Sequence, residues 1–252
     1  MRARKLQFRV RILVADDHEG SSRHAARLIG AALRRRPGLL LGLATGETPT
    51  RTYGLLAARR DRDRSLFRRV RVIKLDEWLG LPLRHPSTCE TYLRKTVLGP
   101  WRVAASRYEG FASRPKDPSA ECARIAAWLA RRGPIDLCVL GLGTNGHLLM
   151  NEPAASLEPG PHVARLSAST QRHSMIRSLS APPRRGLTLG MGDILGSKAV
   201  LLLVSGRHKA AAFRRMVSGT VTTRCPASFL SLHPDVTVLC DREAAGGLSG
   251  TR

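Results

Sequence analysis

The stretch that most constrains the fold is an apolar run ending in a glycine-rich turn, residues 135–153 (IDLCVLGLGTNGHLLMNEP). Its first six residues lack the apolar–polar alternation of a half-exposed strand, so they predict a central strand covered on both faces. Gly143 and Gly146 then allow positive φ angles and a close approach of the backbone to a ligand. The turn is therefore the first place to look for a functional site.

This turn carries an imidazole and a carboxylate, His147 and Glu152, five positions apart. They form a proton-transfer pair if the turn brings them together. Single histidines near strand ends are more often structural, so this role needs support from elsewhere in the chain. GLGTNG also fits the GxGxxG spacing of a dinucleotide-binding turn. Pro153 follows closely and residues 161–175 contain no carboxylate to hold a ribose, which disfavours a dinucleotide.

A second strand and turn lie within residues 39–56 (LLLGLATGETPTRTYGLL), where a buried strand leads through Gly46 to a helix capped by Thr48. Amide hydrogens and hydroxyl groups at such a helix start bind anions. Thr45, Gly46 and Thr48 are therefore predicted to bind the phosphate of a substrate. Glu47 belongs to the same loop, and its side chain is expected to point outward. An ordinary strand–helix turn would show the same spacing.

A third buried strand is predicted over residues 70–75 and ends at two carboxylates, Asp76 and Glu77. Ligands of open α/β sheets bind at the carboxyl ends of the strands, so a carboxylate is well placed there as a base. Carboxylates are common at strand ends, and position alone does not assign that role. Further along, Ser87 and Glu90 have the spacing of a capping box and predict another helix start.

The rest of the chain continues the alternation of helices and strands. Apolar periodicity predicts helices at 16–36 and 118–133, buried strands at 187–189, 199–204 and 236–240, and a short helix from Pro226. This order predicts a three-layer α/β/α protein with a mainly parallel, Rossmann-like sheet. We expect one domain over residues 1–244, with a helical lid at about 155–185 and a flexible tail at 245–252.

The formal net charge of +23 would suit nucleic acid or an anionic surface. The basic residues are, however, scattered over almost every predicted helix, and an aromatic content of 4% is too low for a base-stacking platform. A small anionic substrate explains the charge at least as well, and nucleic acid is not favoured. Five cysteines without CxxC or zinc-ligand spacing suggest reduced thiols in a cytoplasmic protein and no metal site. No apolar stretch approaches the roughly 20 residues of a membrane span.

Three motifs, ATGETP, KLDEW followed by LGLPLRHPSTCETYL, and LGLGTNGHLLMNEP, resemble the glucosamine-6-phosphate deaminase family in order and spacing. The resemblance continues through TLGMGDIL, LLLVSGRHKA and PASFLSLH, and covers about residues 12–240. Four segments are most similar to the galactosamine-6-phosphate isomerase branch of the family: LDEWLGLP, STCETYL, GTNGH and PASFL. The 6-phosphogluconolactonases share the phosphate loop and the glycine turn. The DE of KLDEW and the NEP of LLMNEP, in their surrounding sequence, argue against a lactonase.

This resemblance implies roles for three of the residues. Asp76 corresponds to the base that removes the C2 proton of the opened sugar and returns a proton at C1. Burial is expected to raise its pKa from the usual value of about 3.9 toward the working pH. His147 corresponds to the residue that opens the ring by moving a proton between O1 and O5, and Glu152 orients it. The resemblance implies no cofactor and no metal.

It also implies a set of binding residues. Lys209 matches the lysine that closes on the sugar phosphate, and Gly143 belongs to the turn that approaches the substrate. Asn145 stands two residues before the histidine, where the glucosamine enzymes usually have an aspartate; it accepts a hydrogen bond but cannot share charge with an imidazolium. The phosphate-binding arginine of the lid falls at a non-basic position, Ile176. The neighbouring arginines are the substitutes: Arg172, Arg177, Arg184 and Arg185.

The sequence thus predicts an amino-sugar-6-phosphate isomerase/deaminase acting on galactosamine 6-phosphate, or on glucosamine 6-phosphate, to give the 6-phosphoketose and ammonia. A phosphogluconolactonase-like hydrolase and a non-catalytic sugar-phosphate- or nucleic-acid-binding protein are the alternatives. The sequence leaves open the epimer at C4, the formation of a homo-oligomer, the lid arginine and allosteric regulation.

Overall fold

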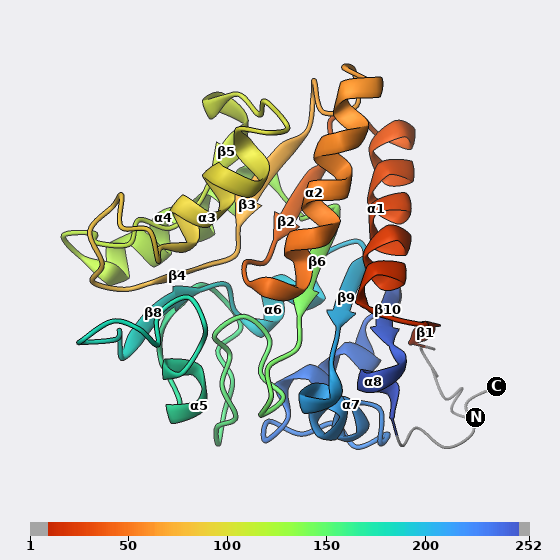
Figure 1. The fold of residues 1–252 in the computed structure, drawn as a ribbon. Helices are drawn as coiled ribbons and strands as arrows, with labels where there is room; N and C mark the ends of the chain where they lie inside the picture. Colours follow the sequence, from red (N-terminus) through yellow and green to blue (C-terminus); the bar gives the residue numbers. More distant parts are fainter. Residues whose placement is uncertain (1–9, 247–252) are drawn as a thin grey trace, which may run out of the picture.

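A seven-stranded sheet forms the centre of the computed structural model, which describes residues 10–246 (Figure 1). The strand order is β1-β10-β9-β6-β2-β3-β5, and every neighbouring pair is parallel. Its strands are β1 (Arg11–Ala15), β2 (Leu40–Leu43), β3 (Arg71–Lys74), β5 (Tyr108–Glu109), β6 (Leu137–Gly141), β9 (Val200–Val204) and β10 (Val236–Asp241). The predicted mainly parallel sheet is confirmed.

One face of this sheet is covered by helices from the first half of the chain. They are α1 (His18–Arg35), α2 (Glu47–Arg62), α3 (Cys89–Leu93) and the π-helical turn that continues it, η1 (Arg94–Leu98). Figure 1 shows α1 and α2 side by side, and they contact each other along their length. Leu41 and Leu43 of β2 pack into this layer together with Tyr53, Ile29 and Trp101.

The opposite face is covered by helices from the second half. They are α4 (Pro118–Arg132), α6 (Met191–Leu195), α7 (Ala210–Met216), α8 (Arg242–Ala245) and the 3-10 helix η4 (Pro226–Leu232). Leu40, Cys138 and Leu202 point into this layer from three strands of the sheet. Because both faces are buried, the strands have continuous apolar runs, and the three-layer arrangement expected from them is confirmed.

A second, antiparallel sheet stands beyond the edge where β3 ends. It consists of β4 (Asp76–Trp78), β8 (Arg185–Thr188) and β7 (His162–Arg165), in the order β4-β8-β7. The sequence did not predict this sheet, and it missed β1, β4, β5 and β7. The segment expected as a helical lid, 155–185, is only partly helical, because it holds β7 and a four-residue helix, α5 (Ala168–Gln171).

Two predicted helix starts were wrong. The N-cap of α2 is Gly46, whose φ of 107° turns the chain into the helix before Thr48 is reached. The N-cap of α3 is Thr88, and not Ser87, because the Thr88 hydroxyl accepts the N–H of Thr91 at 3.1 Å. Glu90 therefore closes no capping box with Ser87, and its carboxylate is bound elsewhere.

The remaining short elements are the 3-10 helices η2 (Ala105–Arg107) and η3 (Arg207–Lys209). From residue 247 on, the tail predicted at 245–252 lies outside the described residues. Within residues 10–246, every helix is too short or too polar to cross a lipid bilayer.

Candidate active site

The strand order brings four of the predicted motifs to one edge of the sheet. Strands β9, β6, β2 and β3 are consecutive neighbours, and all are parallel. Their carboxyl ends therefore lie together. Lys209 follows β9, the turn with His147 follows β6, the loop with Thr45 follows β2, and Asp76 follows β3.

His147 and Glu152 meet across the turn after β6. Nδ1 of His147 lies 3.3 Å from Oε2 of Glu152, and the two side chains are 18% and 11% exposed. Burial by itself would raise the pKa of Glu152, but His147, Thr170 and Asn145 outweigh it and lower the pKa to about 2. Glu152 is thus an anion that orients the imidazole through Nδ1 and leaves Nε2 available to a substrate.

Asn145 completes this pair in a way that the sequence did not predict. Its Oδ1 accepts the backbone N–H of His147 at 3.1 Å, and its Nδ2 donates to Oε2 of Glu152 at 2.7 Å. The amide therefore contacts the carboxylate and not the imidazole ring. An ionised aspartate has no donor to offer Glu152, so an amide suits this position.

The beginning of α5 closes over the pair. The backbone N–H of Ser167 donates to Oε1 of Glu152 at 3.2 Å, and Oγ1 of Thr170 lies 3.3 Å from Nδ1 of His147. Ser169 lies 3.4 Å from Nδ2 of Asn145. The sequence analysis missed these three residues. The sequence feature that could have pointed to them is Ser167 before a helix. A serine there predicts an N-cap but does not predict contacts with Glu152 or His147.

The turn itself is held in an uncommon backbone conformation. Leu149 has a φ of 55°, in the left-handed region that non-glycine residues rarely adopt. Nδ2 of Asn151 donates to the carbonyl oxygens of Leu148 at 3.0 Å and Leu189 at 2.9 Å. These bonds hold the turn against the neighbouring strand region and keep His147 in place.

Gly143 packs directly against the His147 ring, which yields a first prediction. A Cβ at this position would stand 2.5 Å from Cε1 of His147 and closer still to two other ring atoms. Gly143→Ala is therefore expected to displace the imidazole and lower kcat about 10²-fold. Steady-state kinetics measure this effect, and Gly141→Ala, where a Cβ meets nothing within 4 Å, is the control. Equal kcat values in the two variants would contradict the prediction.

Asp76 is a buried carboxylate at the end of β3, paired through β4 with Thr188 of β8. It is 8% exposed, and its Oδ1 has no hydrogen-bond partner among residues 10–246. Burial, and next the charge of Glu77, raises the pKa of Asp76 to about 7, against the opposing charge of Lys74. The expected rise in pKa is confirmed, and the value suits a base that works near neutral pH.

A buried ion-pair network lies beside this carboxylate. Nζ of Lys74 donates to Glu77 at 2.7 Å and to Glu90 at 3.0 Å, and the side chains of Lys74 and Glu77 are fully buried. Burial alone would lower the pKa of Lys74, but the charges of the two glutamates outweigh it and raise the pKa. The sequence analysis missed this network, although a lysine within an apolar strand was its signal.

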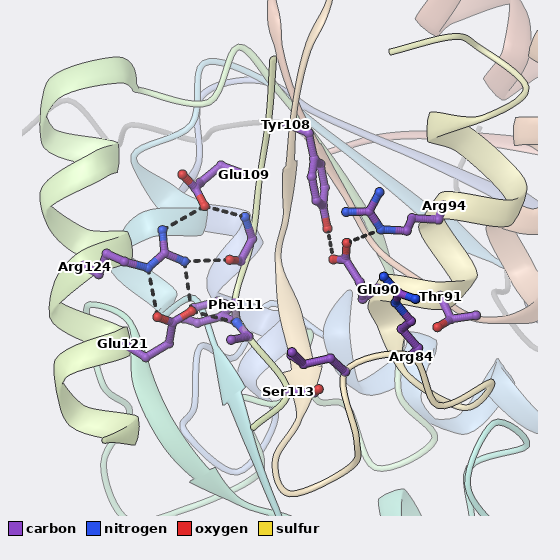
Figure 2. Close-up of a pocket in the computed structure, with 13 residues that line it drawn as sticks. Arg84, Glu90, Thr91, Arg94, Tyr108, Glu109, Phe111, Ser113, Glu121 and Arg124 are labelled. Atoms are coloured by element: carbon purple, nitrogen blue, oxygen red, sulfur yellow. Dashed lines mark hydrogen bonds and ion pairs between the residues drawn. The ribbon is translucent and has the colours of Figure 1, made fainter. Parts of the chain in front are cut away.

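A cavity of about 860 Å³ opens beside Glu90 (Figure 2). Glu90 pairs there with Arg94 and Tyr108, while Arg124 pairs with Glu109 and Glu121. The predicted catalytic residues are not among its lining. Lys74 links Glu90, in the lining of this cavity, to Glu77, which is next to Asp76 in the chain.

The predicted phosphate loop connects β2 to α2, and the hydroxyl of Thr45 donates to Sγ of Cys89 at 3.3 Å. Gly46 forms the N-cap of α2 without a side-chain hydrogen bond, and Glu47 is exposed, as expected. Lys209 is half-buried, and its side chain makes no hydrogen bond or ion pair within residues 10–246. Burial lowers the pKa of Lys209, against the opposing charge of Glu47. Lys209 thus retains its capacity to pair with an anion.

The arginines that were predicted to bind phosphate from the lid lie on the surface. Arg177 and Arg185 are exposed, and neither side chain contacts the site residues in the described part of the chain. Ile176 is fully buried in an apolar cluster with Trp78, Cys89 and Met150. The structure does not bring Arg177 or Arg185 to the site, so their phosphate-binding role stays a prediction.

Taken together, the sheet and the groups at its carboxyl edge define an α/β enzyme fold with its site where such sheets bind ligands. The chain belongs to the family of glucosamine-6-phosphate isomerases/6-phosphogluconolactonase, which matches residues 18–239.

Several relatives are similar over nearly the whole chain. An Escherichia coli (strain K12) protein named "Putative deaminase AgaI" is 41% identical over 86% of both chains. Glucosamine-6-phosphate deaminase 1 of Bacillus subtilis (strain 168) is 35% identical over 94% of this chain and 98% of its own. A solved monomeric glucosamine-6-phosphate deaminase, 35% identical, has a TM-score of 0.89 and covers 94% of this chain and 99% of its own. The 6-phosphogluconolactonase of Trypanosoma brucei, at 21% identity, shares the fold.

Proposed function

We propose that this protein is an amino-sugar-6-phosphate isomerase/deaminase. The observation that carries this proposal is a buried carboxylate, Asp76, at the same sheet edge as the oriented His147. Its Oδ1 has no hydrogen-bond partner among residues 10–246. Relatives that bear the name deaminase cover most of the chain and support it. The proposed substrate is galactosamine 6-phosphate first and glucosamine 6-phosphate second, because Asn145 replaces the usual aspartate of the glucosamine enzymes.

In the proposed reaction, His147 opens the sugar ring by moving a proton from the O1 hydroxyl to O5. Asp76 then removes the proton from C2, and that electron pair forms the C1–C2 double bond of an enolamine. The C1–O1 π pair moves to O1, which takes up a proton from the substrate's ammonium group. Asp76 returns the proton to C1, which leaves an imine at C2. Water adds to this imine, and the carbinolamine expels ammonia to leave the 6-phosphoketose. Lys209 and the start of α2 hold the phosphate.

Measuring ammonium released from each of the two amino sugar phosphates tests this function. The proposal expects release from at least one of them, with the galactosamine ester preferred. If neither ester releases ammonium and 6-phosphogluconolactone is hydrolysed, the deaminase proposal is wrong and the protein is a lactonase. The five cysteines are free and buried, which supports the further proposal of a cytoplasmic enzyme.

The pKa of Asp76 leads to a prediction for the pH dependence. The base must be ionised to accept the C2 proton, so kcat/KM is expected to rise with pH and to level off above about 7. Glu152, with a pKa of about 2, stays ionised throughout this range. The profile is measured from pH 5 to pH 9 with both amino sugar phosphates. A midpoint that shifts with the substrate would belong to the substrate, and a flat profile would contradict the role of Asp76.

A further inference from the structure

His173 lies against the loop that precedes α2, far from it in the sequence. Its Nδ1 accepts the backbone N–H of Met175 at 3.3 Å, so the ring proton is on Nε2. Nε2 stands 3.4 Å from the point where a Cβ on Gly46 would lie. The ring also packs near Trp78, with 5.6 Å between the ring centroids. The Nε2–H donor is thus directed toward the glycine of the predicted phosphate loop.

The charges around His173 are those of the candidate site. Burial lowers the pKa of His173, and the charges of His147 and Lys209 lower it further, while Glu47 opposes them. The imidazole is therefore close to His147 and to Lys209. Within residues 10–246, no protein group accepts a hydrogen bond from its Nε2. A half-buried donor without an acceptor suits an anionic ligand.

Among residues 155–185, no arginine side chain makes a hydrogen bond or ion pair with the loop before α2. Position 176 is a core isoleucine, and Arg177 next to it is exposed. His173 lies three residues before Ile176, in the turn after α5, where the backbone N–H groups of Ile176 and Arg177 both donate to its carbonyl oxygen. Its ring lies near Trp78 and the Gly46 position. The imidazole of this segment thus lies against the loop at Gly46.

We propose that His173 binds the 6-phosphate of the substrate, donating Nε2–H to a phosphate oxygen beside Lys209 and Gly46. The identity of the ligand as a sugar phosphate rests on the proposed function. In this arrangement a neutral imidazole, a lysine and the start of α2 share the anion, with no arginine from the lid. His173 is a binding residue, so its loss affects affinity more than the chemical step.

Inorganic phosphate is the probe that tests this site without turnover. Its Kd is measured by calorimetry for the parent, His173→Ala, His173→Gln and His24→Ala, where His24 is an exposed histidine of α1. A hydrogen bond to a charged group implies that His173→Ala weakens phosphate binding about 10- to 100-fold. Gln, with an amide N–H donor, is expected to recover part of the loss, and His24→Ala leaves the Kd unchanged.

Kinetics with the amino sugar phosphate separate this inference from the proposed function. His173→Ala is expected to raise KM by the same factor, with kcat changed less than about threefold. Phosphate binding that is equally tight in the parent and in both His173 variants overturns the inference. A larger loss of binding in Arg177→Ala than in His173→Ala overturns it as well. If the parent releases no ammonium but its phosphate affinity depends on His173, the site stands and the deaminase function fails.

Discussion

Asp76→Asn is expected to reduce ammonia release by about 10²- to 10⁴-fold, the usual contribution of a positioned general base. Asparagine has nearly the same shape but cannot accept the C2 proton, so the chemical step is lost while the binding groups stay in place. KM, or the Kd for inorganic phosphate, is expected to change little. Steady-state kinetics on the two amino sugar phosphates measure the loss. Turnover within about threefold of the parent would remove Asp76 from the role of base.

The same variant is expected to gain stability at alkaline pH. The folded pKa of Asp76, about 7, lies above the usual 3.8, so ionising the buried carboxylate opposes folding as the pH rises through 7. The full cost of that charge is about 4 kcal/mol at pH 8 and vanishes below the unfolded pKa. Thermal denaturation of the parent and of Asp76→Asn at pH 5 and pH 8 tests this: the variant's advantage must grow with pH. An enzyme that keeps a destabilising base fits the usual trade-off between stability and activity.

Lys74→Met is expected to lower the free energy of unfolding by about 3–5 kcal/mol. Methionine fills a similar volume but leaves Glu77 fully buried and Glu90 partly buried without their shared cation. Urea denaturation measures the free energy of unfolding. Lys198→Met is the matched control, since Lys198 is 49% exposed and its ion pair with Asp136 is worth about 1 kcal/mol or less.

Lys74→Met is also expected to change the pKa of Asp76. The charge of Lys74 lowers the pKa of Asp76, so its removal is expected to move the midpoint of the kcat/KM profile to higher pH. Lys198→Met leaves that midpoint in place. A Lys74→Met protein with parental stability and an unchanged midpoint would show that the network neither holds the fold nor tunes Asp76.

The sequence by itself determined the fold class and the main chemical groups. A continuous apolar run such as that of β6 predicts a strand buried on both faces, and a glycine turn after it predicts a place where the backbone can approach a ligand. Both predictions are possible because the run and the turn are local properties of the chain. Asp76 and His147 could be singled out because each follows such a strand, while their roles, and Lys209, came from the resemblance of the motifs to the family. Helix starts were less predictable: at Gly46, one backbone angle decided the cap that the Thr48 side chain was expected to form.

Only the tertiary structure decided how these groups act together. The order β9-β6-β2-β3 depends on which strands pair, a property of the whole sheet and not of any segment. The contacts of Asn145 with Glu152 and of Lys74 with Glu90, and the approach of His173 to Gly46, join residues whose sequence separation bears no relation to their distance. Burial then set the pKa of Asp76, because the charged form of a carboxylate loses its hydration only when other parts of the chain exclude water around it.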